Sequence, residues 1–133
     1  MPKPPNTELI VFACSGASDA GELADRIARQ LSRTGEARMS CIAGIGGGVK
    51  SILADAAAAR QVLVIDGCPF HCARRTMLAA GLSGFRHLAL PELGFKKGAC
   101  VLSEASIALG VAAAADRLLC SGKPPGDRPD HPA

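Results

Sequence analysis

The chain has 133 residues, of which 48% are hydrophobic and 20% are charged, with a formal net charge of +3. This length fits one domain with one core. The charges are spread along the chain, Trp and Tyr are absent, and Phe occurs four times. A nucleic-acid-binding surface and a stacking platform for single strands are therefore not expected. The longest apolar run, residues 107–115, is too short to cross a membrane, so no membrane segment is expected either.

The chain begins with a proline-rich segment, residues 1–7, which we expect to be flexible. One α/β domain is expected over residues 8–120, followed by a disordered, proline-rich tail over residues 121–133. Residues 8–13 read as the first strand. Residues 18–33 read as an amphipathic helix because apolar positions recur at spacings of three and four. Asp19 with Glu22 three positions later resembles the capping box that starts a helix.

The remaining elements continue the alternation of strand and helix patterns. Further strands are expected over residues 38–43, 61–66 and 86–90, and further helices over residues 49–60, 68–80 and 99–120. Cys68 is the expected N-cap of the second of these helices, with Pro69 at its first position. The alternation predicts a single-domain, doubly wound (Rossmann-like) three-layer α/β sandwich with a mainly parallel sheet of about four strands.

Three of the six cysteines lie where a predicted strand runs out: Cys14, Cys41 and Cys68. The carboxyl ends of parallel strands share one edge of the sheet, and this edge is where such folds bind ligands. Cys72 follows Cys68 by four positions, which is about one helical turn. We therefore expect these four thiols to meet in a soft-metal site or a thiolate reaction centre.

Several interpretations of this cysteine cluster stay open at this point. The thiols can be ordinary buried residues, ligands of zinc or of an iron–sulfur cluster, or the reactive groups of a redox or sulfur-transfer enzyme. In such an enzyme Cys68 or Cys14 is the expected nucleophile, and another cysteine would resolve it as a disulfide. Cys100 is ambiguous and is not assigned as a ligand. Because the cysteines lie inside strand and helix patterns, we expect a reducing, cytoplasmic location rather than a secreted disulfide scaffold.

Other polar and glycine-rich positions near the cysteines have weaker signals. Residues 44–51 differ by one residue from a phosphate-binding loop, because Val49 replaces its second glycine. Nucleotide hydrolysis is therefore not expected, and a flat loop that lets Cys41 approach its partners is the simpler reading. Asp66 is expected to accept helix N–H groups or to support the site, whereas His71 and His87 are not assigned as ligands.

The segment 65–73, Ile-Asp-Gly-Cys-Pro-Phe-His-Cys-Ala, closely resembles the signature of the DGC domain family, small proteins to which zinc binding is ascribed. Residues 41–47 and 14–16 resemble two further blocks of the family, and the resemblance extends over about residues 8–115. It implies four metal ligands, at Cys14, Cys41, Cys68 and Cys72. It supplies no established reaction.

With this resemblance, the leading hypothesis is a zinc-binding (Zn2+) protein that handles or senses its metal ion through a four-cysteine site. A full thiolate shell argues for a structural or metal-handling site, because catalytic zinc keeps an open position. The alternatives at the same thiols are a cysteine-dependent redox or sulfur-transfer enzyme and an iron–sulfur protein. Enzymatic activity, protein partners and oligomeric state are not determined by the sequence.

Overall fold

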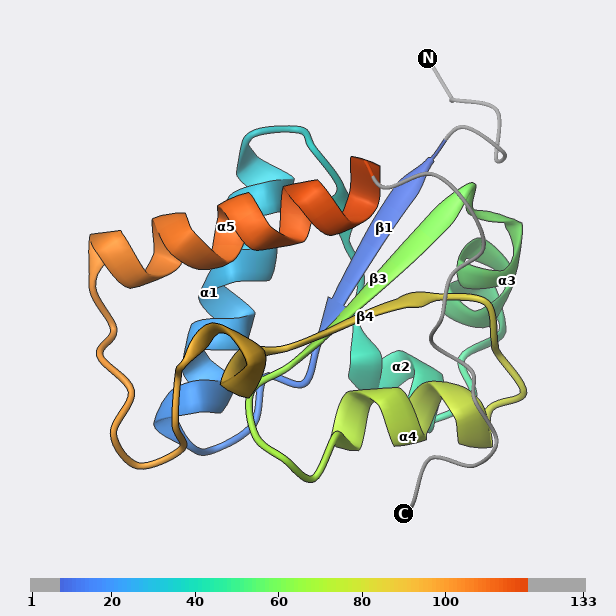
Figure 1. The fold of residues 1–133 in the computed structure, drawn as a ribbon. Coiled ribbons are helices and arrows are strands. Elements are labelled where there is room, and N and C mark those ends of the chain that lie inside the picture. Colours follow the sequence, from blue (N-terminus) through green and yellow to red (C-terminus); the bar gives the residue numbers. More distant parts are fainter. Residues whose placement is uncertain (1–7, 120–133) are drawn as a thin grey trace.

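The computed structural model describes residues 8–119 and contains a four-stranded sheet in the order β2–β1–β3–β4 (Figure 1). All three strand pairs are parallel. The strands are β1 (Leu9–Ala13), β2 (Arg38–Met39), β3 (Gln61–Asp66) and β4 (Arg86–Ala89). The predicted α/β fold with four parallel strands is confirmed. The flexible N-terminus and the disordered tail that we predicted lie outside the described residues.

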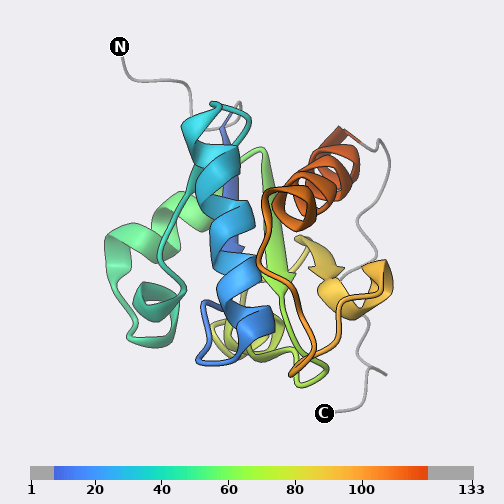
Figure 2. The same cartoon turned by 90° about the vertical axis from the view of Figure 1, so that its left-hand side faces the viewer.

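Helices cover both faces of this sheet. Helices α1 (Asp19–Arg33) and α5 (Glu104–Leu119) pack on one face, and α2 (Ile42–Gly46), α3 (Lys50–Ala58) and α4 (Cys72–Ala79) lie on the other (Figures 1 and 2). Alternate strand residues supply the two cores, since Val11 faces α1 whereas Ile10 and Phe12 face the opposite layer. This arrangement is the three-layer sandwich that the alternation of elements predicted. No helix within residues 8–119 is both long and apolar enough to cross a bilayer.

The second strand is shorter than the predicted strand over residues 38–43. Pairing with β1 ends at Met39, and after a last backbone hydrogen bond from Ser40 N to Val11 O (2.9 Å) the chain turns into α2. Helix α2 therefore includes Gly44, Ile45 and Gly46, the first three residues of the predicted loop. A Cβ on Gly44 would lie 2.2 Å from Cδ1 of Ile52, so a larger residue there would force the Ile52 side chain to move.

The start of α1 differs from the predicted capping box. Ser18 is the N-cap, and its Oγ accepts a hydrogen bond from Gly21 N (3.0 Å). Asp19 is the first helical residue, and its carboxylate accepts N–H groups from Gly98 (2.8 Å) and Cys100 (2.9 Å). These bonds tie the loop after the 3-10 helix η2 (Leu90–Leu93) to the start of α1. Helix α5 consequently begins at Glu104, later than the predicted residue 99.

Candidate thiol site at the carboxyl edge of the sheet

Cys14 and Cys68 follow the neighbouring strands β1 and β3, and the structure brings them together at the carboxyl edge. Cys14 extends the ladder with a hydrogen bond to Ile65 O (3.0 Å), and its Sγ accepts the N–H of Gly67 (3.4 Å). Burial raises the pKa of the Cys14 thiol, and the nearby charges of Asp66 and Cys68 add to the rise, although two backbone N–H groups oppose it. Burial of Cys14 therefore disfavours its thiolate form.

Cys68 and Cys72 lie on either side of a turn, not on one face of a helix as predicted. Helix α4 begins at Cys72, and its N-cap is His71, whose backbone has a left-handed φ of +55°. His71 N donates to Cys68 O (3.3 Å), which closes the turn before the helix. The predicted N-cap at Cys68 is thus wrong, because the left-handed residue interrupts the helical path. Cys68 is partly buried and Cys72 is exposed.

Cys41 is exposed at the N-cap of α2, on the far side of β1 from Cys68. It borders a hollow of about 570 Å³ beneath α1, next to Ser15 and Arg29. Ser15 also has a left-handed backbone (φ +51°), and its Oγ donates to Asp25 (2.8 Å). Non-glycine residues in this region store backbone strain, which often accompanies functional sites. Ser15 and His71, the two non-glycine residues with a left-handed backbone within residues 8–119, are each adjacent to a cysteine. Ser15 follows Cys14, and His71 precedes Cys72.

The four predicted ligands share one edge, but they are not gathered around one point. Within residues 8–119, no group of three or more His, Cys, Asp or Glu side chains is close enough together to hold a metal ion. The donor set itself, four thiols, has the chemistry that zinc prefers. A common metal would therefore require the segments that carry Cys41 and Cys72 to approach Cys14 and Cys68.

Asp66 organises the turn between β3 and α4. It is 1% exposed, and its two carboxylate oxygens accept the N–H groups of Ala73 (2.8 Å) and Arg74 (3.0 Å) at the start of α4. The predicted role of Asp66 as an acceptor of helix N–H groups is confirmed. It takes the place of an N-cap side chain, because His71 makes no capping hydrogen bond with its own side chain.

His87 also belongs to this region, although sequence reasoning did not place it there. Its Nε2 lies 2.8 Å from Oδ2 of Asp66, and its ring meets the ring of His71 edge-on, with centroids 4.9 Å apart. The available signal was a histidine beside Arg86 in the short predicted strand, and this pattern does not point to the thiol site. Only the register of β4 against β3, which pairs His87 with Val64, shows that the ring reaches Asp66.

The rim of the site carries an exposed aromatic residue and a spare cysteine. Phe70 is 63% exposed, and Nζ of Lys97 lies 5.0 Å from its ring centroid. Cys100 packs against the core on the α1 and α5 side, and burial, followed by the charge of Asp19, raises its pKa. Cys100 therefore stays unassigned as a ligand. Cys120 lies outside the described residues.

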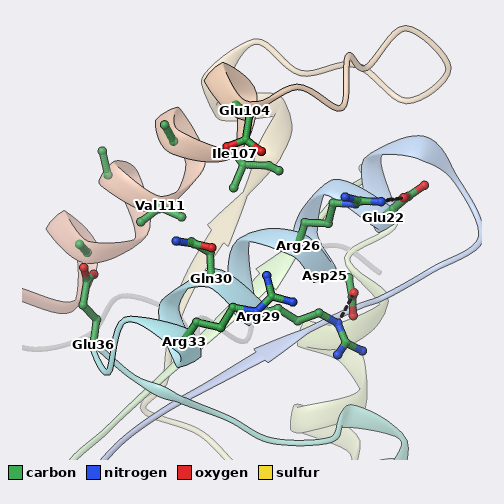
Figure 3. A pocket seen from close by; sticks show the side chains of 13 residues that line it. Glu22, Asp25, Arg26, Arg29, Gln30, Arg33, Glu36, Glu104, Ile107 and Val111 are labelled. Carbon is green, nitrogen blue, oxygen red and sulfur yellow. Dashed lines mark hydrogen bonds and ion pairs between the residues drawn. The ribbon is translucent and has the colours of Figure 1, made fainter.

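A larger hollow of about 700 Å³ lies between α1 and α5, and no cysteine within residues 8–119 lines it (Figure 3). Its arginines are largely engaged along α1, where Arg26 pairs with Glu22 (2.8 Å) and Arg29 with Asp25 (2.6 Å). Such exposed pairs one helical turn apart contribute little to stability. This hollow is therefore a charged groove that shares Asp25 and Arg29 with the hollow beside Cys41.

Comparison with known proteins agrees with the motif. The family described as the DGC domain matches residues 10–113, a span that includes all four predicted ligands. The chain is 39% identical over 113 residues to "Anaerobic and virulence modulator AnvM" of Pseudomonas aeruginosa, covering 85% of this chain and 86% of that protein. No solved structure matches the chain. With the family match spanning all of the sheet except Leu9 and most of α5, this chain belongs to the DGC domain family.

Proposed function

We propose that this chain is a zinc-binding regulatory protein that senses or hands on its metal through Cys14, Cys41, Cys68 and Cys72. One observation supports the proposal: Cys14, Cys41 and Cys68 follow the carboxyl ends of the parallel strands β1, β2 and β3, and Cys72 begins the helix after β3. Two of these thiols are partly buried and two are exposed. The name of the Pseudomonas relative, a modulator, supports a regulatory role over an enzymatic one.

The division between buried and exposed thiols favours reversible binding. Cys14 and Cys68 form a partly buried inner pair after the neighbouring strands β1 and β3, whereas Cys41 and Cys72 are open to solvent and to a metal donor. Bound zinc would supply a positive charge that stabilises the thiolates and links the three segments. Binding in this way releases thiol protons, so affinity for the metal rises with pH.

A structural role for the metal has less support. The two cores of the sheet are formed by apolar side chains such as Phe12, Ile27 and Leu63, all of which are fully buried. The metal would therefore order the edge of the sheet and leave the fold to its hydrophobic packing, as a sensing or transfer site requires.

The redox alternative has less support at Cys14 than at Cys68. Reactive cysteines have a lowered pKa, whereas burial raises the pKa of Cys14. An iron–sulfur cluster would use the same four thiols, and it is separated from zinc by its visible absorption.

The test is metal analysis of protein purified without oxygen, with free thiols counted before and after chelation. We expect about one zinc per chain and four thiols that become reactive only after chelation. Cys41→Ser should lose zinc, whereas the matched control Cys100→Ser should retain it. Metal-free protein with a readily formed disulfide would support the redox alternative, and equal loss in both variants would contradict the ligand assignment.

A further inference from the structure

We infer that His87 is a positioning residue of the thiol site, which acts through Asp66 and His71 to hold the turn between Cys68 and Cys72. Its effect on metal binding rests on the function proposed above. Its effect on the geometry of the turn does not, and it can be measured on the thiols alone.

The sheet register places His87 where it can act on this turn. His87 is opposite Val64, and Asp66 is two residues further along β3. Residues two apart in a strand share a face, so these three side chains all point toward the layer that contains α4. The side chain of His87 is only 12% exposed, which limits the positions that its ring can take.

The contact with Asp66 fixes the carboxylate that starts α4. Oδ1 accepts from Ala73 N, and Oδ2 accepts from Arg74 N and lies 2.8 Å from Nε2 of His87. Because this aspartate accepts at both oxygens, Nε2 of His87 carries the hydrogen and donates it. The imidazole therefore shares Oδ2 of Asp66 with the N–H of Arg74, so it fixes the carboxylate that accepts the first N–H groups of α4.

The contact with His71 acts on the turn itself. His71 has the left-handed backbone that reverses the chain between Cys68 and Cys72, and Arg75 N bonds to its carbonyl (2.9 Å) at the start of α4. Its ring lies edge-on to that of His87, at an interplanar angle of 75°. Such edge-to-face pairs favour one relative orientation. His87 thus contacts the strained residue as well as the carboxylate that caps the helix.

Loss of His87 should release this turn and leave the other segments unchanged. In metal-free protein, we expect alkylation of Cys68 to become severalfold faster in His87→Leu, because the partly buried thiol loses its fixed surroundings. Cys41, which lies beyond β1 on another segment, should react at the wild-type rate. Zinc affinity should fall by about 10- to 100-fold, as is typical when a supporting residue of a metal site is lost.

The experiment compares wild type, His87→Leu and His87→Gln by peptide-resolved alkylation and by zinc titration. His87→Gln restores an N–H donor for Asp66, so it should recover most of the wild-type Cys68 rate. Should His87→Leu fail to fold, His87→Asn replaces it, because its shorter amide keeps the polarity but cannot reach Asp66.

Two results would overturn the inference. The first is a folded His87→Leu or His87→Asn protein with wild-type Cys68 reactivity. The second is an equal acceleration at Cys41, which would indicate general loosening of the fold. If wild type binds no zinc but His87→Leu still accelerates Cys68 selectively, the proposed function fails and the positioning role stands.

Discussion

The substitution Asp66→Asn tests whether one buried carboxylate holds the start of α4. The carboxylate is 1% exposed and receives three donors, from Ala73 N, Arg74 N and His87 Nε2. An asparagine has the same shape, but only one of its two terminal atoms can accept a hydrogen bond. The other terminal atom is an NH₂ group, which would face at least one backbone N–H of the helix.

The cost follows from counting the bonds that the amide cannot replace. If the amide oxygen takes the Oδ2 position, the bonds to Arg74 and His87 persist and that to Ala73 is lost. If it takes the Oδ1 position, the Arg74 bond is lost, and His87 can change tautomer to accept from the NH₂ group. Either way one hydrogen bond to a charged group disappears, which is worth about 1.5–3 kcal/mol.

Urea unfolding followed by helical circular dichroism measures this loss, since the chain has no Trp to serve as a fluorescent probe. With a slope of about 2 kcal/mol per molar urea, the midpoint should fall by roughly 1 M. The matched control is Asp116→Asn, at an exposed position of α5, which should change stability by less than about 0.5 kcal/mol. A loss for Asp66→Asn no larger than that of the control would refute the capping role.

Two further predictions concern contacts between distant segments. Asp19→Asn should speed hydrogen exchange at Gly98, whose N–H binds the carboxylate and is the first cause of its lowered pKa. Because the folded pKa is lowered, Asp19 stabilises the fold at neutral pH, and this stabilisation is lost as the pH falls below about 4. The variant should therefore lose less stability in acid, and an unchanged acid profile would contradict this account. Gly67→Ala should cost about 1–3 kcal/mol, because the new Cβ would lie 2.3 Å from the backbone oxygen of Ala20. Gly16→Ala is its control, with nothing within 4 Å, and equal urea midpoints for the two variants would argue against the clash.

Local sequence patterns were sufficient to predict elements whose bounds depend on their own residues alone. The apolar runs of β1 and β3 and the three-and-four spacing of α1 predicted those elements to within a residue or two. The rule for parallel strands also put Cys14 and Cys68 at one edge, and Sγ of Cys14 indeed accepts the N–H of Gly67, the residue before Cys68.

The same patterns failed where a side chain forms hydrogen bonds with a different segment from the one that the local pattern suggests. Asp19 was predicted to take part in a capping box, but its carboxylate binds the N–H groups of Gly98 and Cys100 instead. Cys68 was predicted to start a helix, but the helix begins at Cys72. The left-handed backbone of His71 makes a turn between the two cysteines, and Asp66 of β3 accepts N–H groups at the helix start. No local periodicity contains these long-range partners.

Apolar spacing along the chain was enough to predict the alternation of strands and helices, the parallel sheet and the strand ends that Cys14 and Cys68 follow. Which side chains surround those cysteines depends on contacts between elements. His87 reaches Asp66 through the register of β4 on β3, and Cys41 stands apart because β2 stops at Met39. Strand register and strand ends depend on packing between elements. That packing leaves Cys14 and Cys68 partly buried and Cys41 and Cys72 exposed.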